Sequence, residues 1–288
     1  MKIDVIIPVY RPTEKLNKVL YGLSRQTYLP ERIILLHTRD GIKLDVSACK
    51  DRVSVTEIPI PEKEFDHGRT RDLGIRMSDA DIVVMMTQDA VPVDSFLLEK
   101  LSETLKEHSD AVAAYARQIP DQNCGLLEKY TRVFNYPPKS QIKSQKDLPK
   151  LGIKTYFCSN VCAAYRRGVY LELGGFPHPV IFNEDLIFAA RTLGMSEWSI
   201  FFRVMIPNAL PGIISGGVLA FARGLGEFGA TAMIAGNIRG KTRTLPLAVY
   251  SAVASGKMDD AGQYVVILVG ISFIVVVCMN YFSMERKG

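Results

Sequence analysis

Two acidic positions in the sequence can carry chemistry. Asp89 follows the predicted strand 81–86 after two polar residues. A single carboxylate at such a strand end can bind a divalent cation that neutralises a diphosphate, although a turn or helix-capping aspartate has the same spacing. Glu184 and Asp185 stand side by side before an apolar stretch. A paired acid can supply a general base, and the first turn of a helix also favours acids, so the spacing leaves both interpretations open.

Strands that alternate with helices are expected to position these acids. Such alternation predicts a mostly parallel sheet with crossover helices, in which ligands gather outside the carboxyl ends of the strands. Tyr10, Asp40 and Asp89 each follow a predicted strand, so we expect them to line one crevice. The predicted strands are 5–9, 33–36, 53–58 and 81–86. One predicted helix is capped by Thr13, and two others cover 68–79 and 95–108. The segment 137–150 is predicted to be a surface loop.

Composition divides the chain into two segments of different class. The 288 residues carry a formal net charge of +5, which is too small to predict nucleic-acid binding, and the sequence has no run of Lys and Arg that would predict it. Residues 1–193 hold 27 basic and 25 acidic residues, whereas 194–288 hold 8 and 5. The mean hydropathy of +0.10 is therefore an average over two unlike parts.

The second segment is apolar enough to predict membrane helices. Nineteen uncharged residues separate Arg203 from Arg223, and 24 separate Asp260 from Glu285. A membrane helix needs about 20 such residues, so spans are predicted over about 209–235 and 264–282, with buried core helices as the alternative.

Six motifs of the first segment carry a resemblance that runs almost continuously to about residue 190. They are the segments 5–10, 65–74, 87–92, 157–167, 173–176 and 182–185. With them the segment resembles the family-2 glycosyltransferases, most of all their bacterial rhamnosyltransferase-like subset. The resemblance implies a GT-A fold, an inverting transfer, a nucleotide-diphosphate sugar donor such as dTDP-rhamnose, and a glycan or lipid acceptor.

The same resemblance implies roles for seven residues. Asp185 matches the catalytic base that deprotonates the acceptor hydroxyl, and Glu184 lies beside it. Asp89 stands where the family's metal-binding aspartate stands, although the usual Asp-x-Asp is here Gln88-Asp89, and this implies Mg²⁺ or Mn²⁺. The family continues to a metal-binding histidine, but no histidine follows His178, so we expect a catalytic domain over 1–188 that ends just after its base. The residues expected at the donor are Pro8, Tyr10 and Asp40 near the nucleoside and Arg71 near the diphosphate.

From about residue 189 a second resemblance begins, carried by the segments 189–194, 204–207, 210–213, 221–230 and 244–247. In these segments the chain resembles a different family, the molybdate-type ABC importer permeases. It implies a cytoplasmic coupling loop over 189–208 that docks an ATP-binding subunit. The family's loop begins with Glu, where this chain has Phe188. The residues expected to dock that subunit are Ala189, Ala190, Gly194 and Pro207.

Together the two resemblances predict a chimera joined near 186–191. The expected architecture is a GT-A-like α/β domain over 1–188, with a mostly parallel sheet and flanking helices, followed by an α-helical membrane segment over 189–288. Glycosyl transfer is the first hypothesis for its function; a molybdate or oxyanion permease component and a fusion without activity are the alternatives. The expected location is the bacterial inner membrane with the first domain in the cytoplasm. Arg286 and Lys287 after the last span agree with this orientation, whereas the basic residues of 239–243 oppose it.

Overall fold

The computed structural model describes residues 1–49, 51–121, 124–180 and 183–285. Phe182, Arg286 and Lys287 lie outside the described residues. The chain divides into two compact units, Met1–Val204 and Met205–Gly288. Each unit is described by itself.

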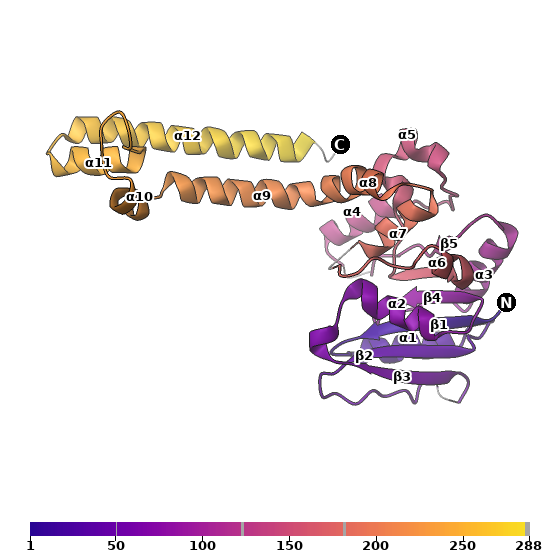
Figure 1. Ribbon diagram of the computed structural model, residues 1–288. Coiled ribbons are helices and arrows are strands. Elements are labelled where there is room, and N and C mark those ends of the chain that lie inside the picture. The colour runs from indigo at the N-terminus through magenta and orange to yellow at the C-terminus, as the bar shows by residue number, and fades with distance from the viewer. Residues whose placement is uncertain (50, 122–123, 181–182, 286–288) are drawn as a thin grey trace. The chain divides into compact units, whose positions relative to one another are not determined.

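The first unit is built on a six-stranded sheet with the order β3-β2-β1-β4-β6-β5 (Figure 1). The first four strands in this order run parallel, and β6 is antiparallel to both of its neighbours. This arrangement confirms the mostly parallel sheet predicted above. The strands are β1 (Ile3–Val9), β2 (Arg32–Thr38), β3 (Ser54–Ile60), β4 (Ile82–Met86), β5 (Ala113–Tyr115) and β6 (Cys162–Arg166).

Helices cover both faces of this sheet, because its central strands are apolar on both sides. Alternate residues of β1 point to opposite faces, so Val5 and Ile6 belong to different core clusters. The cluster around Val5 includes residues of α1 and α3, and the cluster around Ile6 includes residues of α2, α6 and α7. The helices of this unit are α1 (Glu14–Ser24), α2 (His67–Met77), α3 (Leu97–Glu107), α4 (Leu126–Asn135), α5 (Leu148–Leu151), α6 (Arg167–Glu172), α7 (Glu184–Thr192) and α8 (Glu197–Ile200).

Local signals position the two helices nearest the predicted crevice. Thr13 caps α1 by accepting a hydrogen bond from the Lys15 amide, as predicted. Asp66 caps α2 in the same way, accepting from the Arg69 amide at 2.8 Å, and its other oxygen accepts from the Val180 amide at 2.8 Å. A Cβ atom at Gly68 would collide with the Pro177 carbonyl, so glycine is needed where α2 approaches the segment 177–180. The motif 65–74, which holds the cap and the first turns of α2, thus contacts the chain that precedes α7.

Most of the predicted elements are present, and the differences are at the far edge of the sheet. The predicted strands lie within or overlap β1 to β4, and the predicted helices correspond to α1, α2 and α3. Strands β5 and β6 were not predicted, since β5 has three residues and β6 has five, the last of which is Arg166. The predicted surface loop 137–150 ends in a short helical stretch that includes the start of α5.

The first unit continues past the boundary at 188 that the sequence suggested. A π-helical turn, Phe201–Met205, follows α8. Ile200 and Val204 are buried in a cluster with Tyr156, Ile187 and Ala190. These contacts make residues 189–204 part of the compact unit that holds the sheet.

The second unit is entirely helical over its described residues, apart from the turns that connect its helices. Two helices in the described chain are long and apolar enough to cross a membrane: Glu197–Leu225, whose residues up to Val204 belong to the first unit, and Met258–Val277. Twenty residues at about 1.5 Å each extend about 30 Å, the thickness of a bilayer's hydrocarbon core. The predicted span 264–282 lies within the last helix, whereas the predicted span 209–235 is interrupted after Leu225. The helices are α9 (Ile206–Leu225), α10 (Gly229–Ile234), α11 (Leu245–Ala254) and α12 (Met258–Glu285).

Candidate functional site

Three loops meet at one edge of the sheet, where the parallel strands β1, β2 and β4 have their carboxyl ends. Tyr10 follows β1 and Asp89 lies in the loop after β4. Gln88 holds these two loops together, because its Oε1 accepts from the Tyr10 amide at 3.1 Å and its Nε2 donates to the Tyr10 carbonyl at 2.9 Å. Gln88, which precedes Asp89 where the family usually has Asp-x-Asp, therefore has a structural role. Pro8 is half-buried in β1, and the exposed Tyr10 donates its hydroxyl to Glu62.

Asp40 lies in the third loop, which follows β2, and its carboxylate accepts hydrogen bonds from groups of the protein itself. Its carboxylate accepts from the Arg11 amide at 2.7 Å and the Ile42 amide at 2.8 Å, and it lies 3.1 Å from His37 Nε2. The amide of Ile42, followed by that of Arg11, holds the pKa of Asp40 below its ordinary value. Asp40 thus connects the chain after β1 to the chain after β2, and its predicted place near the nucleoside stays a prediction.

Asp89 is exposed beside a buried and unsatisfied hydroxyl. The Thr87 amide donates to the Val161 carbonyl at 3.1 Å, which joins this loop to the start of β6, and Thr87 Oγ1 is buried without a hydrogen-bond partner. Among the described residues, no three His, Cys, Asp or Glu side chains gather as a metal site. One carboxylate fits a cation that takes its other ligands from a diphosphate and water, as Mg²⁺ commonly does.

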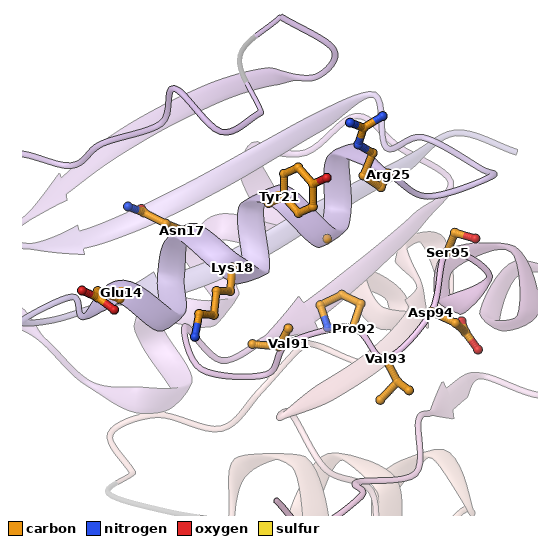
Figure 2. A pocket seen from close by; sticks show the side chains of 11 residues that line it. Glu14, Asn17, Lys18, Tyr21, Arg25, Val91, Pro92, Val93, Asp94 and Ser95 are labelled. Atoms are coloured by element: carbon orange, nitrogen blue, oxygen red, sulfur yellow. The ribbon is translucent and has the colours of Figure 1, made fainter.

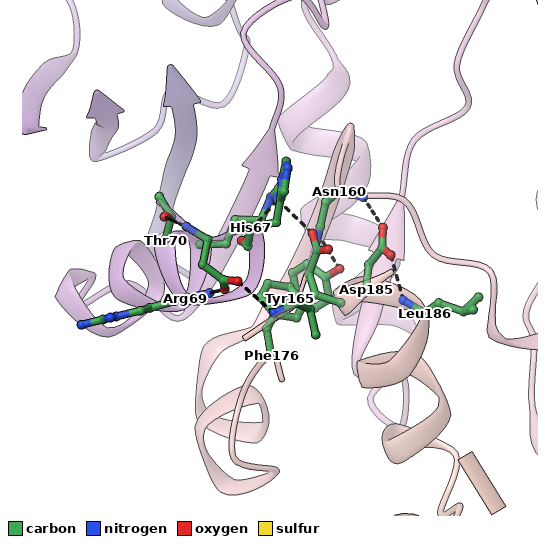
Figure 3. A network of polar contacts seen from close by, with 12 residues as sticks. His67, Arg69, Thr70, Asn160, Tyr165, Phe176, Asp185 and Leu186 are labelled. Atoms are coloured by element: carbon green, nitrogen blue, oxygen red, sulfur yellow. Dashed lines mark hydrogen bonds and ion pairs between the residues drawn. The ribbon is translucent and has the colours of Figure 1, made fainter. Parts of the chain in front are cut away.

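The two acids predicted as the catalytic pair occupy the first turn of α7. Asn183 precedes them in the left-handed conformation, with φ at 68°, which asparagine tolerates better than most residues. Asp185 Oδ2 accepts from the Asn160 amide at 3.0 Å, and its Oδ1 accepts from the Leu186 amide at 2.8 Å (Figure 3). Each oxygen keeps a lone pair, so the carboxylate is fixed in place and can still accept a proton.

Glu184 points into the protein and pairs with Arg71. Its Oε1 lies 2.9 Å from Arg71 Nη1 and also accepts from Asn160 Nδ2 at 3.0 Å. All three side chains are buried. Arg71 Nη1 also donates to His67 Nδ1 at 3.1 Å, while its buried Nε has no partner. Arg71 therefore neutralises Glu184, and its predicted contact with a diphosphate stays a prediction.

This arrangement raises the affinity of the Asp185 carboxylate for a proton. Burial, followed by the neighbouring negative charge of Glu184, raises the pKa of Asp185 to about 6. The amides of Asn160 and Leu186 and the charge of Arg71 oppose that rise. Burial, with the charge of Arg71, lowers the pKa of His67, so its imidazole is held neutral as an acceptor beside the guanidinium.

Asn160 is the residue at this site to which the sequence assigned no role. Its amide binds Asp185, its Nδ2 binds Glu184, and its Oδ1 accepts from the Tyr165 hydroxyl at 2.8 Å. Tyr165 packs edge-on against Phe176 and Phe188, which fixes the hydroxyl that holds Asn160. The sequence signal that could have identified Asn160 is a polar residue just before a mostly apolar strand, within the motif 157–167 that carries the family resemblance.

A cleft elsewhere on this unit contains none of the predicted donor or catalytic residues. It lies between α1 and the loop 91–95, and has a volume of about 710 Å³. Tyr21, Lys18 and Arg25 line its α1 side (Figure 2).

The residues predicted to dock an ATP-binding subunit have unlike surroundings. Ala190 is fully buried in the cluster with Tyr156 and Val204, so its side chain faces the protein interior. Ala189 is half-buried, whereas Gly194 and Pro207 are exposed. Ala190 therefore has no exposed surface to offer a partner.

Comparisons with known proteins agree with this division of the chain. Residues 4–174 match glycosyl transferase family 2, and residues 181–285 match the binding-protein-dependent transport system inner membrane component family. The O-antigen chain rhamnosyltransferase RfbN of Salmonella typhimurium is 38% identical over 195 residues, which are 67% of this chain and 61% of that protein. The molybdenum transport system permease protein ModB of Escherichia coli is 44% identical over 104 residues, which are 35% of this chain and 45% of that protein.

The fold is also found among solved structures. A crystal structure of residues 1–349 of TarS from S. aureus superposes with a TM-score of 0.50 at 15% identity, covering 67% of this chain and 55% of that one. The chain thus spans about three fifths of the length of the curated rhamnosyltransferases and under half that of the permease. The permease-like region and its apolar helices indicate membrane association. The chain belongs to glycosyl transferase family 2, and it is a chimera in which a rhamnosyltransferase-like region is joined to a molybdate permease-like region.

Proposed function

We propose that the first unit transfers a sugar from a nucleotide-diphosphate donor to an acceptor hydroxyl, with inversion at the anomeric carbon. The observation that carries the proposal is Asp185, held by two amides at the start of α7 with a pKa of about 6. Its neighbour Asn160 precedes Val161, whose carbonyl binds the loop that holds Asp89. A base and an acidic side chain suited to a diphosphate's cation thus belong to adjoining segments.

In the proposed reaction Asp185 accepts the proton of the acceptor hydroxyl. The acceptor oxygen forms a bond to the anomeric carbon as the bond from that carbon to the diphosphate oxygen breaks, and the nucleoside diphosphate leaves with the electron pair. Asn160 and Leu186 orient the carboxylate, and Glu184 raises its affinity for a proton. We place the nucleoside near Pro8, Tyr10 and Asp40, and the diphosphate near Arg71.

The experiment for this proposal is a donor screen with the full chain. The purified protein is incubated with nucleotide sugars, dTDP-rhamnose first, in Mg²⁺ or Mn²⁺, and release of nucleoside diphosphate is measured with and without glycan and lipid acceptors. Release that depends on one donor supports transfer. Absence of release and transfer with every donor would leave the fusion without activity, the alternative stated above.

The family's divalent cation is assigned to Asp89. A cation at this carboxylate would neutralise charge on the leaving diphosphate. We expect Asp89→Asn to raise the concentration of Mg²⁺ or Mn²⁺ needed for half-maximal donor cleavage, with Asp94→Asn in the same connecting segment as the matched control. An unchanged cation dependence in Asp89→Asn would remove Asp89 from this role.

A pH profile separates the roles of the two acids. The ionised Asp185 is the active form, so transfer should fall as the pH drops through about 6. Glu184→Gln removes a neighbouring negative charge and leaves Arg71 unpaired, and both changes favour ionised Asp185. We therefore expect the acid limb of kcat/KM to move to lower pH in Glu184→Gln, whose amide oxygen still accepts from Asn160. A limb that stays in place would show that Glu184 does not tune the base.

We also propose where the chain acts. The two candidate spans would hold it in the bacterial inner membrane, with the first unit on the cytoplasmic side where nucleotide sugars are made available. The segment 189–208 as a docking loop for an ATP-binding subunit remains a prediction supported by the permease-like match. Any such contact must use exposed positions such as Gly194 and Pro207, because Ala190 is buried.

A further inference from the structure

Helix α4 has an apolar face that the described residues of the first unit leave largely exposed, and the Lys154 ammonium, 3.1 Å from the centre of the Phe134 ring, lies over one end of it. At 100° per residue, five side chains of this helix fall within a sector of about 120°. None of the residues of α4 is buried. The five side chains, with their exposed fractions, are Leu126 88%, Leu127 81%, Tyr130 65%, Val133 62% and Phe134 49%.

The opposite side of α4 and the chain that follows it are basic. Arg132 lies 3.6 Å from Glu128 on the polar side, and Lys129 is exposed beside them. Residues 126–154 hold seven basic and two acidic residues, an excess of five, which equals the formal net charge of the whole chain. An exposed apolar face beside a local excess of positive charge is typical of helices that lie in the surface of an anionic bilayer.

We propose that α4 is an interfacial helix that inserts its apolar face into the surface of an anionic membrane. The two candidate spans in the same chain keep this unit near a bilayer, which raises the effective concentration of lipid at α4. The aromatic rings suit the headgroup boundary, and Tyr130 and Phe134 are already stacked at 5.9 Å. Lysines of the following segment then contact lipid phosphates; Lys139, Lys146 and Lys150 are exposed for this. The inference concerns membrane contact and does not depend on sugar transfer.

A single tryptophan moved between neighbouring positions tests the proposal. Trp198 is the one tryptophan of the chain. In a Trp198→Phe background, Tyr130→Trp places the probe on the apolar face, and Thr131→Trp places it about 100° away on the same helix. The full chain is reconstituted in nanodiscs of phosphatidylcholine, with or without phosphatidylglycerol, and quenching by brominated lipid is measured.

We expect strong quenching and a blue-shifted emission for the Tyr130→Trp probe in anionic discs, less in neutral discs, and little for the Thr131→Trp probe. The triple change Lys139→Gln, Lys146→Gln and Lys150→Gln should reduce quenching of the apolar-face probe in anionic discs to the neutral-disc level. The matched change of Lys15, Lys18 and Lys43 to Gln removes equal charge from another part of the unit and should not.

Three results would overturn the proposal. Solvent-like emission of the Tyr130→Trp probe without quenching would mean that the face does not contact lipid. Equal quenching of the two probes would mean that α4 does not lie with its apolar face in the membrane. A blue shift without lipid quenching, lost when discs contain one chain only, would assign the face to a second copy of this chain.

Discussion

Replacing Asp185 with asparagine is expected to lower kcat for transfer about 10²- to 10⁴-fold, the usual contribution of a general base. Asparagine cannot take the acceptor's proton, whereas the rest of the site stays in place. Steady-state kinetics with the donor found by the screen measures the change. The donor's KM should change little, because Asp185 is proposed to act on the acceptor hydroxyl.

Two controls make this result specific. The introduced asparagine side chain would accept from only one of the two amides that now bind the carboxylate, so hydrogen exchange in α7 must show that the helix is intact. Asp110→Asn removes the same charge from an exposed position and should leave kcat unchanged. If kcat of Asp185→Asn equals that of the starting protein while α7 is intact, the base is another group and the proposed mechanism is wrong.

The largest effect on stability is expected from Arg71. Arg71 and Glu184 have side chains only 10% and 6% exposed, and their facing atoms are 2.9 Å apart. Arg71→Met leaves the Glu184 charge buried without its cation, and removing one partner of such a pair costs about 3–5 kcal/mol. We expect that loss in the free energy of unfolding of the first unit, measured by hydrogen exchange of the β6 amides.

A second variant distinguishes the lost charge pairing from lost packing. In Arg71→Met with Glu184→Gln the buried negative charge is gone and the amide oxygen can still accept from Asn160. Most of the stability should therefore return. If the double variant is as unstable as Arg71→Met, the packing of the arginine stem matters more than the ion pair. Equal stability of Arg71→Met and the starting protein would contradict the burial of the pair.

Local patterns predicted the elements whose cause is local. A few neighbouring residues suffice to predict β1 and β4 from their apolar β-branched runs and the start of α1 from its capping Thr13. Because Tyr10, Asp40 and Asp89 follow the ends of parallel strands, their place at one edge of the sheet was also predictable. Two interpretations of Glu184 and Asp185 were open. Both acids do lie in the first turn of α7, so the helix-start interpretation is confirmed, and the role of Asp185 as a base stays a proposal.

Contacts between distant residues could not be read from these patterns. Asn160 precedes Glu184 by 24 residues and Asp185 by 25, and Arg71 is more than 100 positions away from both. Antiparallel pairing of β6 with β4 brings Asn160 to the carboxyl-end edge of the sheet. Spacing along the chain does not predict such pairing, so the sequence did not identify Asn160 as part of this site.

The sequence by itself determined that this protein has two parts, a parallel α/β glycosyltransferase-like region and an apolar helical region, because composition and hydrophobic period are local properties. It also identified Asp89, Glu184 and Asp185 as candidates for chemistry, and their roles stay proposals. Only the tertiary structure decided that Arg71 neutralises Glu184 and that two amides hold Asp185 while its burial raises its pKa. The tertiary structure also decided that residues up to Val204 complete the first unit. Those features arise from burial and from side chains brought together across the sheet, and both exist only in the folded chain.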